Sequence, residues 1–316
     1  MILDTLRSWL QRPQGESTTP PITFDPDVGG SFDHYARTWK PARTDMEVTR
    51  TGKGVERDPA KKGQLRLPGD EWGEQQGLTD VYSRLIPELN PGNGPIDLLE
   101  IGAGAGRLTE VLVRTFNQRL GRYETVDVSA EMTLRLQQRI EPIRSVTSHV
   151  ISGVDLSVLK DKSFDLCISQ SCFSHVNFYD QYRFLRDLRR VLRPGAPFVV
   201  MGIFLMGTGD DWTWNRFLNR IEKLEKHARP IFHEFIGIQQ LAEMMMRLGW
   251  VIECMFHNGY IIRRGPDRDT VSTAQVDTIP AQQRQFPYLH SVEEYLGQPY
   301  RRRSRLMSLD WRQSAT

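Results

Sequence analysis

The stretch Leu98-Leu99-Glu100-Ile101-Gly102-Ala103-Gly104-Ala105-Gly106-Arg107 joins an apolar run to a glycine-rich turn and then to residues with helical spacing. This order predicts a buried strand, a turn whose glycines let the backbone approach a ligand, and a helix whose N-terminal N–H groups attract a negative group. The dinucleotide pattern GxGxxG needs a small residue where this sequence has Arg107. The spacing therefore disfavours a nicotinamide-dependent oxidoreductase.

A carboxylate follows the next predicted strand, which ends at Val126-Asp127. Asp127 lies 21 residues after Gly106. A carboxylate at the tip of the second strand can accept hydrogen bonds from both hydroxyls of a ribose. With the glycine turn, Asp127 indicates an adenosine-type cofactor. The alternative is a glycine turn needed only for tight packing of strand against helix.

The rest of the central chain alternates apolar, strand-like runs with helix-period segments. This alternation predicts an α/β fold with a Rossmann-like, doubly wound, mostly parallel sheet. Asn258-Gly259, between two apolar runs, predicts a C-terminal antiparallel hairpin strand. Strands are expected at 96–101, 123–128, 146–151, 164–169, 198–205, 250–256 and 260–263, and helices at 79–89, from 108, at 182–192 and at 241–248.

The two ends of the chain have a different texture. We expect an N-terminal extension over 1–77, a cofactor-binding domain over 78–264 with an insertion at 206–232, and a C-terminal tail over 265–316. Residues 2–10 place apolar side chains on one helical face, which predicts a helix docked on its own protein or, alternatively, a weak membrane or partner contact. Residues 13–30 have the composition of a linker, and 43–66 that of a mobile loop or substrate lid.

Composition excludes several classes of function. The 316 residues carry 41 Lys and Arg against 39 Asp and Glu, which argues against a binder driven by the field of a polyanion. No transmembrane segment or signal peptide is evident, and a cytoplasmic location is expected. Three cysteines without a CxxC pair, and histidines without a ligand spacing, predict no metal site. The arginines at 301, 302, 303 and 305 are expected to be a solvated end, with RNA or an anionic substrate as the alternative.

Four segments together resemble a known family. They are LLEIGAGAGR at 98–107, TVDVSAEM at 125–132, SFDLCISQSCFSHV at 163–176 and RVLRPGAPFVV at 190–200. Their order and spacing resemble those of class I S-adenosylmethionine-dependent methyltransferases with a type 11 or type 12 core. The resemblance covers roughly residues 78–264 and implies S-adenosyl-L-methionine as the cofactor.

The resemblance also implies roles for particular residues. Glu100 would hold the methionine ammonium, Asp127 the ribose hydroxyls, and the backbone of Gln170 the methionine amino group. Either Ser152 or Asp155 would contact adenine, and we leave both open. The full set implied for the cofactor is Glu100, Gly102, Ala103, Gly104, Gly106, Asp127, Val128, Met132, Ser152, Gly153, Asp155 and Gln170.

The acceptor is less clearly indicated. A hydroxyl acceptor needs a general base, whereas an amine needs one much less. Candidates are His175, His233 and Glu234, each with a structural role as the alternative. Exposed tryptophans beside carboxylates suit stacking on sugars or aromatic rings, so Trp72, Trp212 and Trp214 are candidate substrate contacts, with anchoring in the core as the alternative.

These features predict O-methylation of a small polar molecule, at a sugar, glycan or secondary-metabolite hydroxyl. The alternatives are an N-methyltransferase of RNA or protein and a non-catalytic scaffold that binds an adenosine cofactor.

Overall fold

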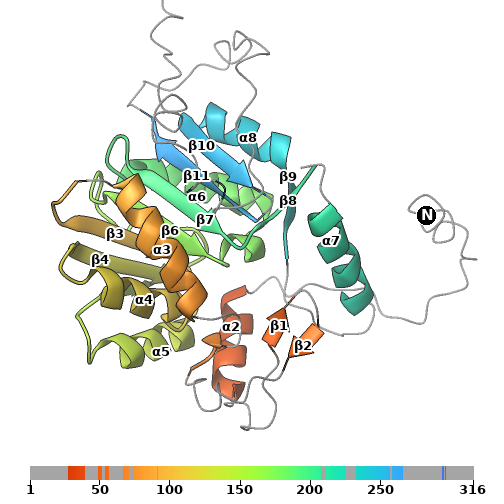
Figure 1. Ribbon diagram of the computed structural model, residues 1–316, viewed down its shortest axis with the longest axis horizontal. Helices are drawn as coiled ribbons and strands as arrows, with labels where there is room; N and C mark the ends of the chain where they lie inside the picture. Colours follow the sequence, from red (N-terminus) through yellow and green to blue (C-terminus); the bar gives the residue numbers. More distant parts are fainter. Residues whose placement is uncertain are drawn as a thin grey trace, which may run out of the picture.

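A seven-stranded sheet forms the centre of the molecule (Figure 1). The computed structural model describes residues 28–39, 49–51, 54–56, 67–70, 75–90, 92–207, 211–224, 233–256, 258–265, 294 and 296. The strands of the sheet run in the order β10-β11-β7-β6-β3-β4-β5. Their bounds are β3 Ile96–Ile101, β4 Leu120–Asp127, β5 Thr147–Val150, β6 Leu166–Gln170, β7 Pro197–Met201, β10 Trp250–Phe256 and β11 Gly259–Arg264.

The pairing confirms the predicted fold class. Strands β7, β6, β3, β4 and β5 are parallel, and β11 runs antiparallel to both of its neighbours, β7 and β10. Strands β10 and β11 form the predicted antiparallel hairpin, in which Gly259 pairs with Phe256 and Asn258 lies in the connection before β11. From β3 the chain first adds strands on one side of it, β4 and then β5, and afterwards adds strands on its other side, β6 and then β7. This reversal opens a crevice at the carboxyl ends of the strands, where such sheets bind ligands.

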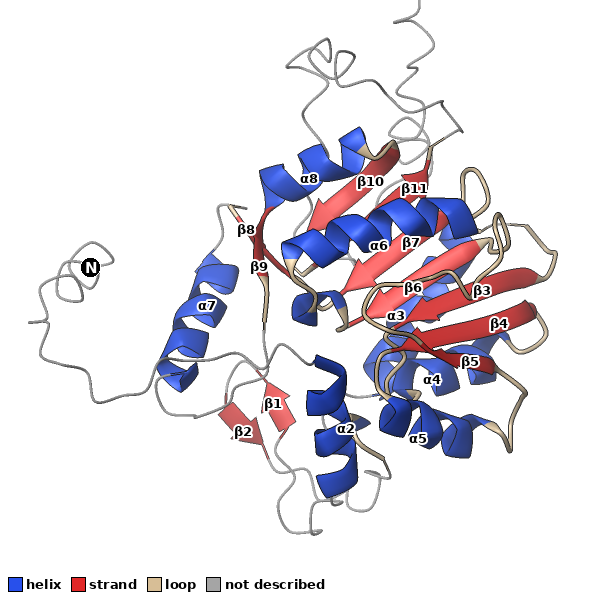
Figure 2. Ribbon diagram, turned by 180° about the vertical axis from the view of Figure 1, so that it is seen from behind, coloured by secondary structure: helices blue, strands red, loops and turns tan. Residues whose placement is uncertain are grey.

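Helices cover both faces of the sheet (Figures 1 and 2). Helices α3 (Gln75–Leu89) and α4 (Arg107–Phe116) bury their apolar sides against one face. Helices α6 (Phe178–Val191) and α8 (Ile238–Arg247) pack on the other. Helix α5 (Ala130–Ile140) lies beside α4 and β5. Each face therefore has its own hydrophobic core.

One predicted strand is wrong. The apolar run 198–205 is divided: β7 ends at Met201, and β8 (Phe204–Met206) pairs in parallel with β9 (Phe235–Gly237) outside the main sheet. Gly202 causes the break, because its φ of 76° lies in the left-handed region. A Cβ at this position would lie 2.5 Å from Oγ of Ser171, so only glycine fits.

The appended parts correct a second expectation. Residues 28–30 are not linker, because helix α2 (Val28–Thr38) begins at Val28 and packs on α5. Within 43–66, β1 (Thr49–Thr51) and β2 (Gly54–Glu56) form a small antiparallel hairpin. Helix α7 (Asp211–Leu224) lies in the insertion at 206–232. The segment 2–10 and the arginines at 301–305 lie outside the described residues, and the domain boundaries stay predictions. Among the described helices, none is long and apolar enough to cross a membrane.

Candidate functional site

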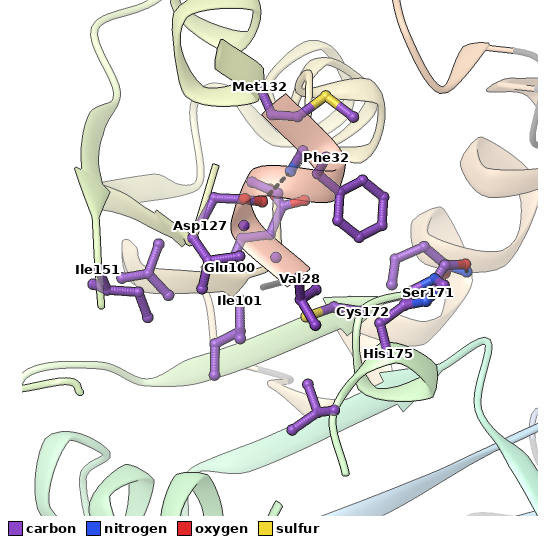
Figure 3. A pocket seen from close by; sticks show the side chains of 18 of the residues that line it. Val28, Phe32, Glu100, Ile101, Asp127, Met132, Ile151, Ser171, Cys172 and His175 are labelled. Atoms are coloured by element: carbon purple, nitrogen blue, oxygen red, sulfur yellow. Dashed lines mark hydrogen bonds between the residues drawn. The ribbon is translucent and has the colours of Figure 1, made fainter. Parts of the chain in front are cut away.

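A cavity of about 690 Å³ lies at the carboxyl ends of β3, β4 and β6 (Figure 3). Its floor is the glycine turn after β3, and its walls come from the ends of β4, β5 and β6. The volume falls within the range of small-molecule and cofactor sites. The cavity therefore occupies the place where the sequence predicts a cofactor.

The three glycines of the turn have different surroundings. A Cβ on Gly102 would lie 2.3 Å from Cys172, and one on Gly106 would lie 2.9 Å from Leu136. A Cβ on Gly104 would meet nothing within 4 Å, although its φ of 54° is also left-handed. Gly102 and Gly106 therefore serve packing, whereas Gly104 opens onto the space that a ligand could fill.

Asp127 is fixed at the tip of β4 by backbone donors. Its Oδ2 accepts the N–H of Gly104 at 2.8 Å, and its Oδ1 accepts the N–H of Ser129 at 2.9 Å. Burial raises the pKa of the carboxyl, while the hydrogen bonds from the backbone oppose that rise. The carboxylate lines the cavity with its remaining lone pairs. It can accept hydrogen bonds from hydroxyl groups there.

Glu100 is a second carboxylate in the lining. Its Oε2 accepts the hydroxyls of Thr109 at 2.7 Å and Tyr123 at 2.5 Å, which leaves Oε1 as the oxygen that a ligand could bond. Burial raises the pKa of Glu100 to about 7, although the hydrogen bonds from the two hydroxyls act to lower it. A cationic ligand would therefore favour the ionised form and be attracted by it.

The part of the cavity near Asp127 is mostly apolar. Val128, Met132 and Ile151 line it together with the backbone of Ser152 and Gly153. Asp155 is not among the lining residues: it is exposed, and its Oδ1 accepts the N–H of Ser157 at 2.8 Å. Of the two residues left open for adenine, the structure thus brings Ser152 to the cavity and turns Asp155 toward its own loop.

Gln170 ends β6 and lines the cavity. Its Oε1 accepts the hydroxyl of the fully buried Tyr82 at 2.9 Å, and its Nε2 donates to Oγ of Ser171 at 3.2 Å. Ser171 has a φ of 60°, which is uncommon outside glycine. Both side-chain ends of Gln170 are thus bonded within the protein.

The other part of the cavity holds His175, in the short 3₁₀ helix Phe173–His175 that follows β6. Its imidazole lies edge-on to the ring of His233, with the centroids 4.6 Å apart. The N–H of Glu234 donates to the carbonyl of Ser174 at 2.7 Å, and burial raises the pKa of the Glu234 carboxyl. The structure therefore brings the three candidate catalytic residues together, although His175 alone of the three lines the cavity.

Of the three tryptophans predicted to contact the substrate, the structure describes the side chain of Trp214, which does not line this cavity. Trp214 is 50% exposed on α7 and lies edge-on to Phe217, with ring centroids 5.6 Å apart. Its side chain is absent from the lining. Trp72 and the side chain of Trp212 lie outside the described part of the chain.

Sequence reasoning expected a lid at 67–73 but missed the part of the cavity roof that α2 forms. Val28, Gly29 and Phe32 of α2 line the cavity, and so do Pro68 and Gly69 of the turn at 67–70. Figure 3 shows Val28 and Phe32 beside Cys172 and His175, and the Phe32 and His175 rings are 5.3 Å apart. The helical spacing of Val28, Phe32 and Ala36 was a usable signal, hidden by the Pro- and Gly-rich residues before it.

These features fit an adenosine-type cofactor with a cationic end. Gly104 leaves room where any side chain would fill the cavity, Asp127 offers acceptors for hydroxyls, and Glu100 offers one for an ammonium group. No group of three or more His, Cys, Asp or Glu that could hold a metal ion occurs among the described residues.

Residues 99–200 match the methyltransferase domain family. With the fold and the cavity, this match over about a third of the chain supports a class I S-adenosylmethionine-dependent methyltransferase domain at these residues, with S-adenosyl-L-methionine as its cofactor.

Two curated relatives are similar over part of their length. The chain is 32% identical over 127 residues to the malonyl-[acyl-carrier protein] O-methyltransferase of Brevibacillus brevis, which covers 40% of this chain and 44% of the relative. It is 27% identical over 115 residues to the norajmaline N-methyltransferase of Rauvolfia serpentina, covering 35% and 37%. The chain thus spans less than half the length of either relative. Among solved structures, the PH0226 protein of Pyrococcus horikoshii OT3 aligns with a TM-score of 0.48 at 16% identity over 63% of this chain and 93% of that one.

Proposed function

We propose that the protein transfers the methyl group of S-adenosylmethionine to an oxygen atom of a small acceptor, of which a sugar, glycan or secondary-metabolite hydroxyl is the expected class. The observation that carries this proposal is the shape of one cavity: two carboxylates, Glu100 and Asp127, stand over its glycine floor, and the imidazole of His175 lines its other part.

The cofactor part of the cavity would be used as follows. Asp127 accepts hydrogen bonds from the ribose hydroxyls, Glu100 attracts the methionine ammonium, and the backbone of Ser152 and Gly153 contacts the adenine together with Met132. Bound there, the sulfonium of the cofactor supplies an electrophilic methyl group. The contribution of these residues is to hold the cofactor in one orientation, because in-line displacement depends on alignment.

The acceptor part would supply the base. We propose that His175 takes the proton of the acceptor hydroxyl. In this proposal His233 and Glu234, which lie beside His175 but do not line the cavity, support the position of its imidazole. The oxygen acceptor is supported by this cluster, because an amine acceptor needs a general base much less. The relative at 32% identity is named for transfer to oxygen and the relative at 27% for transfer to nitrogen, so the similarities alone leave both chemistries open.

A matched acceptor screen tests the proposal. Methyl-labelled S-adenosylmethionine is incubated with pairs of sugars and aromatic metabolites that differ by one hydroxyl or one amine. The expected result is transfer to the hydroxyl member, with kcat reduced by about 10²–10⁴-fold in His175→Gln. His34→Ala, on the exposed side of α2, is the matched histidine control. Transfer to amines alone, or an unchanged kcat in His175→Gln, would contradict the oxygen acceptor and the base respectively.

A further inference from the structure

One side chain of α2, that of Asp33, forms hydrogen bonds that lead from the roof of the cavity to the cofactor floor. Asp33 Oδ1 accepts the hydroxyl of Ser129 at 2.5 Å and the N–H of Glu131 at 3.1 Å. These donors belong to the N-terminal end of α5, where backbone N–H groups lack helical partners. Asp33 therefore acts as a capping residue for α5, supplied by a helix almost 100 residues earlier in the chain.

Ser129 carries this contact onward to the cofactor carboxylate. Its hydroxyl donates to Asp33 and accepts the N–H of Met132 at 3.1 Å, while its own N–H donates to Asp127 at 2.9 Å. Asp127 in turn accepts the N–H of Gly104. A chain of hydrogen bonds thus runs from the roof, through the cap of α5, to the floor of the cavity.

The same helix reaches the acceptor part of the cavity. Phe32, next to Asp33, lines the cavity and lies edge-on to His175 (Figure 3). Among the described residues, the apolar cluster beneath α2 is small: Ala36, Ala105 and Met132 are its buried members, and Phe32 and Tyr35 join it from the roof. We therefore expect polar contacts such as that of Asp33 to contribute to the docking of α2.

The turn at 67–70 is attached to the same helix. Arg139, near the C-terminal end of α5, donates to Asp70 at 2.6 Å and to Glu110 at 3.2 Å; Arg139 and Glu110 are buried, and Asp70 is partly buried. The N–H of Gly69 donates to the hydroxyl of Tyr35 at 3.2 Å, which ties the turn to α2. Both parts of the roof are therefore anchored on α5.

From this geometry we propose that α2 is a closing roof and that Asp33 is the positioning residue that couples its docking to occupancy of the cofactor site. Hydrogen bonds from a bound cofactor to Asp127 add to those that already hold this carboxylate and, through Ser129, favour the docked position of Asp33. The docked helix in turn encloses the cofactor and sets Phe32 against His175. The inference rests on the proposed function, because it takes the Asp127 cavity as the cofactor site.

The first test measures binding of S-adenosylhomocysteine by calorimetry. Asp33→Ala is expected to weaken binding about tenfold, whereas Asp33→Asn, which keeps an acceptor oxygen, is expected to stay within about threefold of wild type. His34→Ala, one residue along on the exposed side of the same helix, is the control and should bind as wild type does. Wild-type affinity in a folded Asp33→Ala variant would overturn the proposal.

The route of the coupling is tested by a double-mutant cycle. Ser129→Ala removes the hydroxyl that links Asp33 to Asp127 but keeps the bond from the N–H of Glu131 to Asp33. Asp33→Ala should therefore weaken S-adenosylhomocysteine binding less in that background than in the wild type. Two fully additive losses would overturn the route through Ser129. If the loss of the α5 cap leaves Ser129→Ala unfolded, Ser129→Thr serves instead, and it should retain the effect of Asp33→Ala.

Hydrogen exchange supplies a readout that a merely structural role would not move. S-adenosylhomocysteine should slow exchange of the amides at 28–38 in the wild type and in His34→Ala, and this protection should be largely lost in Asp33→Ala. Protection of α2 that is the same with and without ligand would overturn the proposal. Failure of the wild type to bind S-adenosylhomocysteine at all would instead refute the cofactor site, so the two failures are distinguishable.

Discussion

The floor and the roof of the cavity are held in place by different kinds of interaction. The floor is held by backbone: buried parallel strands, glycines in the left-handed region and N–H groups that fix Asp127. The roof is held by side chains, chiefly Asp33, Tyr35 and Asp70, over a small apolar cluster. A floor of this kind gives a constant cofactor geometry, whereas a roof of this kind can detach without unfolding the sheet.

The sharpest contrast lies within the glycine turn. Gly102→Ala places a methyl group 2.3 Å from Cys172 on a backbone with a φ of 68°. Strain and overpacking together should reduce the free energy of unfolding by about 3–5 kcal/mol. Gly104→Ala meets no neighbour within 4 Å and should cost about 1–2 kcal/mol, from the positive φ alone.

Urea unfolding of the two variants measures this difference. The folded Gly104→Ala variant should also bind S-adenosylhomocysteine more weakly, because its methyl group enters the ligand space. Equal destabilisation by the two substitutions would mean that both glycines are needed for packing and that Gly104 does not leave space for a ligand.

Asp127 tests the floor by binding. Asp127→Ala should weaken S-adenosylhomocysteine binding by about 1–3 kcal/mol, because charge-assisted hydrogen bonds to the ribose are lost. Calorimetry on the folded variant measures this loss, and NADH should not compete with S-adenosylhomocysteine in the wild type. An unchanged affinity would place the ribose elsewhere in the cavity.

Glu100 gives the floor a pH dependence. Its folded pKa of about 7 lies above the ordinary value of 4.5, because burial disfavours the carboxylate. The folded state thus binds more protons than the unfolded state between these values, so the free energy of unfolding should fall as pH rises through that window, by about 3 kcal/mol in all. Binding of a cationic ligand should change in the opposite direction, strengthening about tenfold from pH 6 to 8 as the carboxylate forms.

Thermal unfolding and S-adenosylhomocysteine titrations across pH 5–8 measure both trends. Glu100→Gln, which cannot ionise, is the control and should reduce the pH dependence of both the stability and the ligand affinity. A wild-type affinity that does not change between pH 6 and 8 would show that Glu100 does not meet the ammonium group.

The sequence predicted the floor better than the roof for a physical reason. Residues such as Gly104 and Asp127 act through local backbone geometry, and their spacing along the chain records that geometry. Asp33 and Phe32 act only once α2 has docked on α5, nearly 100 residues away, and no local pattern records such a contact. The division of the run 198–205 was missed for the same reason, since Ser171, which excludes a side chain at Gly202, lies about 30 residues earlier, just after β6.

The smallest expected effect separates the roof from the insertion. The sequence marks Trp214 as a contact to the acceptor, but the structure places its ring against Phe217 rather than in the cavity lining, where Phe32 lies. Trp214→Ala should therefore leave S-adenosylhomocysteine affinity at the wild-type value and change the KM for the acceptor by less than about threefold, because a half-exposed ring contributes little to a site it does not line. Phe32→Leu, which keeps the apolar character but removes the ring beside His175, should raise that KM more. Steady-state kinetics with the acceptor found in the screen measure both values. A larger KM effect from Trp214→Ala than from Phe32→Leu would assign acceptor recognition to α7 and leave α2 as a cover for the cofactor alone.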